Sequence, residues 1–330
     1  MCSRNEIDKK NNETIKRIAK KYPNILLKYI NSLSRKTSYT KMAYIRYIGD
    51  FLNYMNSNLI YDIYDLEQYK NIKPMDIDDY MEFIRYKKEG KEKSGMYRAA
   101  HLAAINSFFK FLQKNQLISS NPCDTIETPK DKNEHIITTI TNEDLEIIIN
   151  NIKNGIGSQK AKSTQKKWQN RDIALITLGL STGLRIGAIV GIDINDIDFK
   201  NKCINVIEKG DINKKIYIGT NTIKVLKEWI KDRKQFVDDS EPALFICQGN
   251  RRISVRSVEK KFKAISEQTG KRLTPHKMRA TCATRLYEQT GDIYLVQQQL
   301  GHKSIENTKR YAKVSEERKR TAANILDTLY

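Results

Sequence analysis

Hydrophobic residues recur every three or four positions through most of the first 115 residues. In the clearest stretch, Met42, Ile45 and Ile48 fall on one side of a helix, because an α-helix completes a turn in about 3.6 residues. Asp76 precedes another such run and is interpreted as its N-cap. The pattern predicts helices over residues 22–33, 38–56, 76 onward and 94–115, behind a polar N-terminal lead. The first part of the chain is therefore predicted to be an all-helical domain.

This pattern stops between residues 121 and 134. The stretch contains Pro122 and Pro129, two of the six prolines, and shows no apolar repeat. Proline and polar residues clustered in this way are typical of connecting segments. We predict an N-terminal domain at 1–128, a linker at 129–140 and a second domain at 141–330.

The second domain mixes two kinds of pattern. Thr141 precedes an apolar run in a sequence that resembles a capping box, so a helix is expected to begin there. Residues 203–208 and 214–219 alternate Ile, Val or Tyr with polar residues, which predicts a short β-hairpin. The helix that begins at Thr141 is predicted to cover 141–153. Further helices are predicted over 171–181, 184–191, 221–233, 254–268, 276–288, 292–299 and 315–330. The predicted fold class is mostly α with a small β-sheet.

The chain is strongly basic, with 59 Lys and Arg against 39 Asp and Glu among 330 residues, a net charge of +20. Such a protein most often binds a polyanion, and duplex DNA is the commonest one. A basic solubility surface or a membrane-facing patch is the alternative. No segment reaches the roughly 18 consecutive apolar residues of a membrane span, and the first residues lack the apolar core of a signal peptide. The five cysteines are scattered, which favours reduced thiols. We predict a cytoplasmic, nucleoid-associated protein without a membrane partner.

Two stretches concentrate this charge. Residues 153–171 hold six basic and no acidic residues, and we interpret them as a mobile loop, either suited to phosphate or simply solvated. In the second stretch, Ser254 is the expected N-cap of a helix that buries an apolar stripe and turns basic residues outward. A basic helix face suits the DNA major groove, although an ordinary surface helix would have the same pattern. The predicted DNA-binding residues are Arg251, Arg252, Arg256, Lys260 and Lys263.

A 36-residue stretch near the C-terminus combines His276, Arg279, His302 and Tyr311. Exchange of a phosphodiester needs an in-line nucleophile, cations on the non-bridging oxygens and a proton for the leaving 5′ oxygen. Arginine suits the second task because its planar fork donates two hydrogen bonds and keeps its charge. Arg279 follows His276 by one helical turn, so both can face one point. Upstream, Arg185 begins a predicted helix.

The remaining roles follow from side-chain chemistry. Imidazole donates hydrogen bonds and exchanges protons near neutral pH, so His276 and His302 are assigned as phosphate ligands and proton handlers. Lys209, at the predicted hairpin tip, is the expected general acid. Tyr311 is the expected nucleophile, because a phosphotyrosine keeps the bond energy of the cut strand and a DNA hydroxyl can reverse the attack without ATP.

A metal-dependent reaction would use carboxylates instead. Asp193, Asp196 and Asp198 are close in sequence, and two metal ions on them would give nuclease or transposase chemistry. They alternate with Ile at a strand entry, however, where acidic residues commonly cap. Residues 155–157 lack the spacing and strand context of a nucleotide-binding loop. We therefore predict neither a metal nor another cofactor.

Taken in order, Thr182-Gly-Leu-Arg185, Lys209, His276-Lys-Met-Arg279, Leu300-Gly-His302 and Tyr311 resemble the catalytic set of tyrosine recombinases, the family of phage integrases and Xer-type proteins. The resemblance is specific over 171–311 and looser over 35–128. It implies a helical SAM-like core-binding domain and an α+β catalytic domain that close on DNA as a C-shaped clamp. It also implies strand exchange through a 3′-phosphotyrosine and a Holliday junction, for integration or excision of a mobile element or for Xer-like resolution.

The resemblance further implies double-stranded DNA core sites and a homotetramer in which the helix at 315–330 docks onto a neighbouring protomer, with room for an accessory DNA-bending or directionality protein. Two positions depart from the family pattern. Ala188 stands where an acidic residue is common, and Ala280 where His is frequent. Two alternatives stay open: a type IB topoisomerase that works as a monomer, and a non-catalytic DNA-binding protein on the same scaffold.

Overall fold

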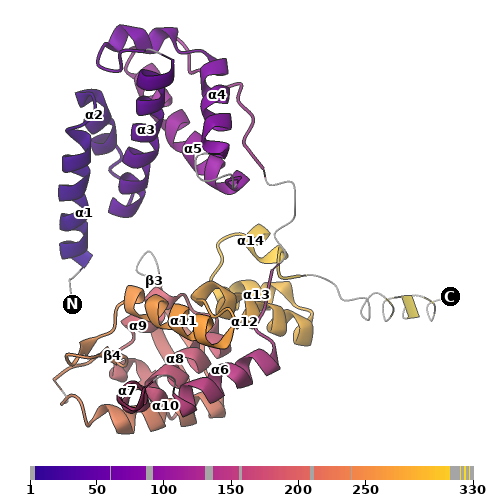
Figure 1. The fold of residues 1–330 in the computed structure, drawn as a ribbon. Helices are drawn as coiled ribbons and strands as arrows, with labels where there is room; N and C mark the ends of the chain where they lie inside the picture. Colours follow the sequence, from indigo (N-terminus) through magenta and orange to yellow (C-terminus); the bar gives the residue numbers. More distant parts are fainter. Residues whose placement is uncertain are drawn as a thin grey trace. The chain divides into compact units, whose positions relative to one another are not determined.

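The computed structural model describes residues 4–59, 61–86, 92–130, 137–155, 158–208, 212–238 and 240–312, together with positions 320, 323, 324 and 327. For residues 4–7, 208 and 212 it describes the backbone alone. Figure 1 shows a chain that divides into two compact units, Met1–His135 and Ile136–Tyr330. Each unit has its own hydrophobic core, as expected of a domain.

Helices build the N-terminal unit around a core of aromatic rings. Tyr29 and Phe108 meet edge to face with centroids 5.3 Å apart, and Phe51 meets Tyr80 in the same way at 5.2 Å. Edge-to-face pairs add to the hydrophobic gain of burial. The elements are α1 (Arg4–Ala19), α2 (Asn24–Ser32), α3 (Ser38–Asn58), the 3₁₀ helix η1 (Leu66–Asn71), α4 (Pro74–Arg85) and α5 (Gly95–Lys114).

The start of the chain and the start of α4 differ from the sequence prediction. The polar lead is largely helical, because Ile15 and Ala19, one turn apart, are buried where α1 packs against α3. The prediction of Asp76 as an N-cap is wrong. The helix begins earlier, at Pro74, whose fixed φ suits a first helical position. Asp76 acts from inside the first turn, where its carboxylate accepts a hydrogen bond of 2.8 Å from the backbone N–H of Lys73.

The second unit packs its helices with two small antiparallel sheets. The larger sheet has the order β1-β2-β3, and the predicted hairpin is its β2–β3 pair, in which Ile204 lies opposite Ile216. None of the helices that the structure describes is long and apolar enough to cross a lipid bilayer. The strands are β1 (Ile197–Asp198), β2 (Cys203–Glu208), β3 (Ile212–Tyr217), β4 (Ile246–Cys247) and β5 (Arg251–Arg252). The helices are α6 (Asn142–Asn154), α7 (Gln159–Lys167), α8 (Gln169–Thr182), α9 (Ile186–Gly191), η2 (Ile194–Asp196), α10 (Thr220–Arg233), α11 (Val255–Thr269), α12 (Pro275–Thr290), α13 (Ile293–Leu300) and α14 (Glu306–Lys309).

Helix α8 is central to this unit and packs against both α10 and α12. Trp229 of α10 is fully buried, and its indole N–H donates to the carbonyl of Leu244 at 2.8 Å. Thr141 and Ser254 cap α6 and α11 as the sequence predicted. The mostly helical fold class with a small sheet is confirmed. The predicted tail helix at 315–330 lies largely outside the described residues.

The prediction of a loop across 153–171 is wrong for residues 159–167, which form α7. The hydroxyl of Ser158 caps the helix by accepting from the N–H of Ala161, and Lys, Gln and Ala are good helix formers. No side chain of α7 is buried. The apolar repeat by which helices are usually predicted is therefore missing from its sequence.

A buried cluster of charges joins three elements of the second unit. Two guanidinium nitrogens of Arg171 donate to one carboxylate oxygen of Asp172 at 2.9 and 2.7 Å, and a third donates to the carbonyl of Ile246 at 3.0 Å. The ammonium of Lys261, on α11, lies 3.0 Å from the other oxygen of Asp172. The cluster therefore ties α8 to α11 and to β4.

We expect Asp172→Ala to lower the free energy of unfolding of the second unit by about 3–5 kcal/mol, because two cations lose their buried counter-charge. Denaturant titration of wild type and variant measures the difference. Glu259→Ala, on the exposed side of α11, is the control and should cost no more than about 0.5 kcal/mol. Equal stability of the two variants would contradict a structural role for the cluster.

Candidate active site

A glycine turn places the first arginine of the motif. Helix α8 ends at Thr182, and Gly183 follows with φ +64° in the left-handed region, where glycine is favoured. A Cβ on Gly183 would also lie 2.8 Å from a methyl of Leu300 and 3.1 Å from the sulfur of Cys282. The turn thus requires glycine both for its positive φ and for lack of space for a Cβ atom. It leads directly to Arg185, which is exposed at the N-cap position of α9.

The second arginine is buried and holds two loops together. Arg279 lies in the second turn of α12, and its two terminal nitrogens donate to the carbonyls of Gly183 and Leu300, each at 2.6 Å. One carbonyl belongs to the turn before Arg185, and the other to the segment before His302. Arg279 therefore brings the Thr182–Arg185 and Leu300–His302 parts of the motif to the same place. His276 stands one turn earlier on α12 and is exposed.

His302 is held from two sides. Gly301 ends α13 with φ +64°, and the backbone N–H of His302 donates to the carbonyl of Gln297 at 3.1 Å. The ring atom Nδ1 lies 2.9 Å from the hydroxyl of Thr308, which is fully buried. With that hydroxyl as donor, the neutral ring carries its proton on Nε2, where it can be donated to a phosphate oxygen.

Burial and the surrounding positive charge keep the ring of His302 neutral. Burial, and then the positive charges of Arg279, Arg185, Arg310 and Lys214, lower the pKa of His302 from 6.5 to about 4. Both motif arginines therefore act electrostatically on this imidazole. At neutral pH the ring is therefore an uncharged hydrogen-bond donor and holds no imidazolium proton that it could transfer.

Tyr311 follows directly from the short helix α14. Its backbone N–H donates to the carbonyl of Thr308 at 2.9 Å, and its ring lies nearly parallel to that of His302 with centroids 6.3 Å apart. The ring packs against a small apolar cluster from α12 and α13. Thr308 thus contacts His302 through its side chain and Tyr311 through its backbone. Sequence reasoning missed this residue, because a threonine six positions after His302 gains meaning only from the fold.

Arg185, Arg279, His302 and Tyr311 therefore gather in one part of the second unit. Lys209 lies outside the described residues, between the ends of β2 and β3. Of the two departures from the family pattern, Ala280 is buried in α12, and Ala188 is half-buried one turn after Arg185. A methyl group at position 188 cannot accept a hydrogen bond from Arg185, as a carboxylate could.

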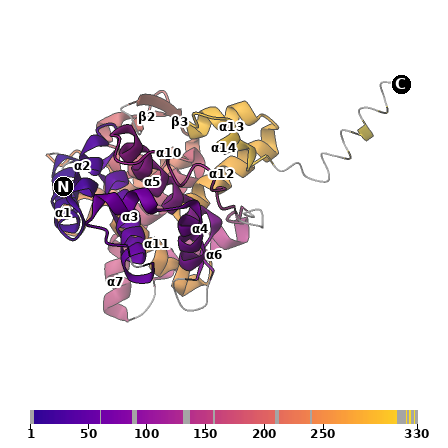
Figure 2. The same cartoon turned by 90° about the horizontal axis from the view of Figure 1, so that it is seen from above.

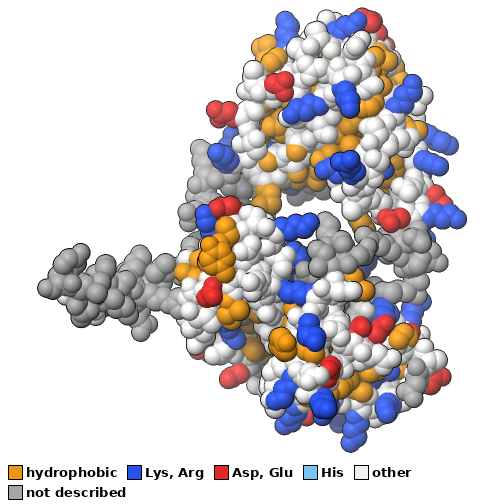
Figure 3. All heavy atoms as spheres, turned by 180° about the vertical axis from the view of Figure 1, so that it is seen from behind, with side chains coloured by type: hydrophobic (Ala, Val, Ile, Leu, Met, Phe, Trp, Pro, Cys, Tyr) orange, Lys and Arg blue, Asp and Glu red, His pale blue; other side chains and the backbone are white. Residues whose placement is uncertain are grey.

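The predicted DNA-binding residues fall into two groups. Val258, Phe262 and Ile265 of α11 are buried as expected, and the opposite side of that helix is exposed. Four of the five predicted DNA-binding residues are exposed: Arg251 on β5, and Arg256, Lys260 and Lys263 on α11. On the face drawn in Figure 3, Lys and Arg side chains spread over both units and acidic ones are fewer, which suits an extended polyanion.

Arg252 differs from its neighbours. Its side chain is only 13% exposed, pairs with the carboxylate of Asp193, and donates to the carbonyls of Val190 and Ile192 at 3.0 and 3.1 Å. These contacts favour a structural role for Arg252 over contact with DNA.

The three aspartates of the metal alternative are engaged with protein donors. Asp193 pairs with Arg252, and Asp196 accepts from the backbone N–H of Asp193 at 2.8 Å. Hydrogen bonds from the backbone and side chain of Asn201 lower the pKa of Asp198. Within the part of the chain that the structure describes, no group of three or more His, Cys, Asp or Glu is arranged to hold a metal ion.

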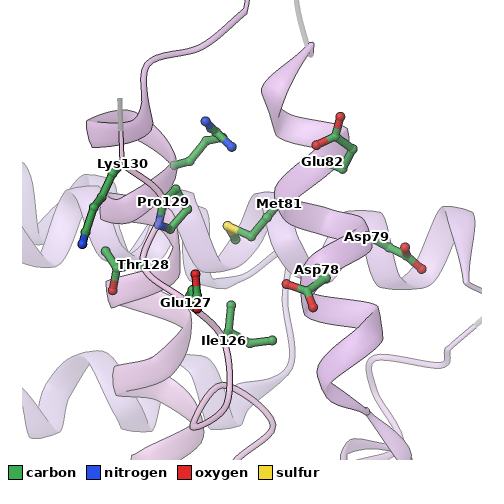
Figure 4. A pocket seen from close by; sticks show the side chains of 10 residues that line it. Asp78, Asp79, Met81, Glu82, Ile126, Glu127, Thr128, Pro129 and Lys130 are labelled. Carbon is green, nitrogen blue, oxygen red and sulfur yellow. The ribbon is translucent and has the colours of Figure 1, made fainter. Parts of the chain in front are cut away.

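The N-terminal unit has an acidic hollow of about 860 Å³ between α4 and the segment 126–130 (Figure 4). Its lining includes Asp78, Asp79, Glu82 and Glu127 against two basic residues, Arg98 and Lys130. Carboxylates repel phosphates, so this hollow does not suit a DNA backbone. The DNA contacts predicted for this unit are therefore not expected at the hollow.

Arg252→Ala should lower the free energy of unfolding by about 1–3 kcal/mol, because Asp193 and the carbonyl of Val190 lose the guanidinium as donor. The carbonyl of Ile192 keeps the backbone N–H of Leu244. Arg251→Ala, at the neighbouring exposed position, should change it by less than about 0.5 kcal/mol. Chemical denaturation of both variants decides between the roles. An Arg252 variant as stable as wild type would return this residue to the DNA-binding set.

The lowered pKa of His302 also predicts a dependence of stability on pH. Between pH 6.5 and about 4 the unfolded chain binds a proton at this ring that the folded chain does not, so stability falls as the pH falls through that range. His302→Gln should lose less stability than wild type when the pH drops from about 7 to about 4.5. Parallel denaturation curves at both pH values test this, and equal losses in the two proteins would speak against a neutral His302.

Comparison with known proteins agrees with this geometry. Residues 138–318 match the profile of the phage integrase family. Tyrosine recombinase XerC of Caldanaerobacter subterraneus is 29% identical over 324 residues, which cover 93% of this chain and 87% of the relative. Tyrosine recombinase XerC of Corynebacterium glutamicum is 31% identical over 237 residues, 72% of this chain and 73% of the relative.

Solved structures share the fold. XerH recombinase bound to its difH substrate, in a pre-cleavage complex, superposes with a TM-score of 0.66 at 22% identity, covering 91% of this chain and 84% of that one. The Tn1549 transposon integrase in complex with transposon right end DNA superposes with a TM-score of 0.71 at 20% identity, covering 92% and 98%. The family match spans more than half of the chain and includes both motif arginines, His302 and Tyr311. The chain belongs to the phage integrase family, the tyrosine recombinases.

Proposed function

We propose that this recombinase cuts each DNA strand with Tyr311, whose phosphodiester target is bound by Arg185, Arg279, His276 and His302. The observation that carries the proposal is the pair of hydrogen bonds from Arg279 to the carbonyls of Gly183 and Leu300. Through them a single guanidinium joins the turn before Arg185 to the segment before His302. The nucleophile then follows from the helix that also holds the ring of His302.

In the proposed reaction the phenol oxygen of Tyr311 attacks the scissile phosphorus. The bond between phosphorus and the 5′ oxygen breaks, and a 3′-phosphotyrosine forms. Arg185 and Arg279 offset the negative charge that develops on the non-bridging oxygens. His302, neutral at physiological pH because of its lowered pKa, donates a hydrogen bond from Nε2 to one of them.

Two proton transfers complete the cleavage step. The His302 ring carries no imidazolium proton at neutral pH, because its pKa is lowered to about 4. We therefore assign protonation of the leaving 5′ oxygen to Lys209 and removal of the phenolic proton to the exposed His276. The 5′-hydroxyl of another strand can then attack the phosphotyrosine and release Tyr311, which balances bonds and charges without an external energy source. Two rounds of this exchange, through a Holliday junction, would recombine two duplexes.

The partners of the proposal are double-stranded DNA core sites, closed in a clamp by the domain at 1–128 and the domain at 141–330, and three further copies of the chain. The superposed structures support DNA as the partner, since XerH is bound to difH and the Tn1549 integrase to transposon end DNA. We further propose that the segment 315–330 is exchanged between protomers of the tetramer. An accessory DNA-bending or directionality protein would act on this assembly, which would work on the nucleoid.

Covalent trapping tests the chemistry. Wild-type protein mixed with nicked duplex fragments of its source genome, in EDTA, should form an SDS-resistant adduct at a defined sequence, and Tyr311→Phe should form none while binding the same DNA. Tyr294→Phe, an exposed tyrosine on α13, is the matched control and should react as wild type does. Sequencing the attached DNA would give the target site.

Each other outcome favours a named alternative. No adduct from wild type despite tight binding would favour a non-catalytic scaffold protein. Adducts at scattered sequences, with relaxation of supercoiled DNA by a monomer, would favour a topoisomerase. An adduct that persists in Tyr311→Phe would move the nucleophile to another residue.

A further inference from the structure

Lys214, on β3, reaches the end of the helix that leads to His302. Its ammonium donates to the carbonyl of Gln299 at 2.9 Å and also to the carbonyl of Gln298. Both carbonyls belong to the last turn of α13, where the carbonyls lack the i+4 partners of a helix interior. The carbonyl of Gln298 also accepts from the backbone N–H of Gly301 at 3.1 Å. The C-terminal end of a helix also carries a partial negative charge. A lysine at this place satisfies the hydrogen bonds and the charge together, and β3 lies beside α13 in Figure 2.

The same helix end is fastened to other parts of the site. The amide of Gln299 donates to the carbonyl of Thr182 at 2.9 Å, and Arg279 donates to the carbonyl of Leu300 at 2.6 Å. The side chain of Gln297 donates to the carbonyl of His302 at 3.0 Å. These contacts join α13 to α8, α12 and its own following loop. Lys214 joins the β-sheet to the same end of α13.

The sheet matters because its hairpin carries Lys209. Strand pairing sets Lys214 opposite Val206 and Ile212 opposite Glu208, the residue before Lys209. The backbone of β2 and β3 is therefore fixed relative to Lys214 up to the point where the turn begins. Since Lys214 is in turn bound to the end of α13, a shift of the hairpin would be passed to the segment that holds His302.

We propose that Lys214 is a positioning residue, which binds the C-terminal carbonyls of α13 and so sets His302 in register with the hairpin that carries Lys209. Its catalytic consequence rests on the proposed function of these residues. The contact between Lys214 and α13 does not rest on that function, because it exists in the free protein.

The neighbouring Lys215 offers a matched control. Successive residues of a strand point to opposite faces, and Lys215 is exposed while Lys214 is half-buried. Replacing either lysine removes one positive charge from the same strand. A difference between the two variants therefore reports on the contact with α13 and not on net charge.

The first test uses the protein without DNA. Burial and the charges of Arg279, Arg185, Arg310 and Lys214 together keep the pKa of His302 at about 4, so NMR titration of the His302 ring reports on its surroundings. In Lys214→Met this pKa should rise, and in Lys214→Arg and Lys215→Met it should stay near its wild-type value. An unchanged titration in Lys214→Met would overturn the contact itself.

The second test measures the rate of Tyr311 adduct formation at saturating protein on a nicked substrate. Lys214→Met should slow it by about 10- to 100-fold, as expected when a catalytic group is displaced by an ångström or less. Lys214→Arg should recover most of the rate, and Lys215→Met should stay within about twofold of wild type. Equal rates in Lys214→Met and Lys215→Met would overturn the positioning role.

The two readouts separate the two proposals. If wild type forms no Tyr311 adduct, the proposed function fails, and the titration still decides whether Lys214 binds α13. If Lys214→Met does not fold, Lys214→Gln, which keeps most of the side-chain length without the charge, replaces it in both measurements with the same expected results.

Discussion

The candidate site depends on the two hydrogen bonds that the buried guanidinium of Arg279 donates. These bonds span about a hundred residues of sequence in one direction and about twenty in the other, since they reach Gly183 and Leu300. A buried cation without partners is very costly, so the two loops have to stay closed around it. Both loops turn through a left-handed glycine, Gly183 and Gly301, which lets their carbonyls approach the same side chain. The close fit of Gly183 against Leu300 and Cys282 completes this closure.

The same arrangement sets the electrostatics of the site. Arg279 and Arg185 hold positive charge in place in the free protein, so the proposed binding of a phosphate would need little reorganisation. Burial, together with this charge, suppresses protonation of His302, which leaves the imidazole as a neutral donor. The contacts made by Thr308 fix which ring atom donates and where the tyrosine follows. These features of the free protein support both the proposed phosphate binding and the assignment of the leaving-group proton to Lys209.

Sequence reasoning went furthest where a pattern has a local cause. The buried stripe of α11, the caps at Thr141 and Ser254 and the strand alternation of the hairpin depend on neighbours a few residues away, and the structure has them as expected. The motif residues were recognised by their order and spacing. Arg251 and Arg252 could not be told apart in this way, because the partners of Arg252 are carbonyls some sixty residues distant. The start of α4 was missed because a proline two residues before Asp76 outweighs the cap preference, and α7 because it buries nothing.

Helix α14 comprises only Glu306–Lys309. A single turn of helix is unstable alone, since fixing its first turn costs more than one hydrogen bond returns. Its place therefore depends on the buried Thr308 and on the packing of Tyr311 against α12 and α13. Detaching such a turn exposes little apolar surface, so local opening costs far less than unfolding the domain. Tyr311, the proposed nucleophile, could thus leave its contacts with α12 and α13 and return to them while the arginines stay in place. Exposure of this side chain would then be separate from the stability of the fold.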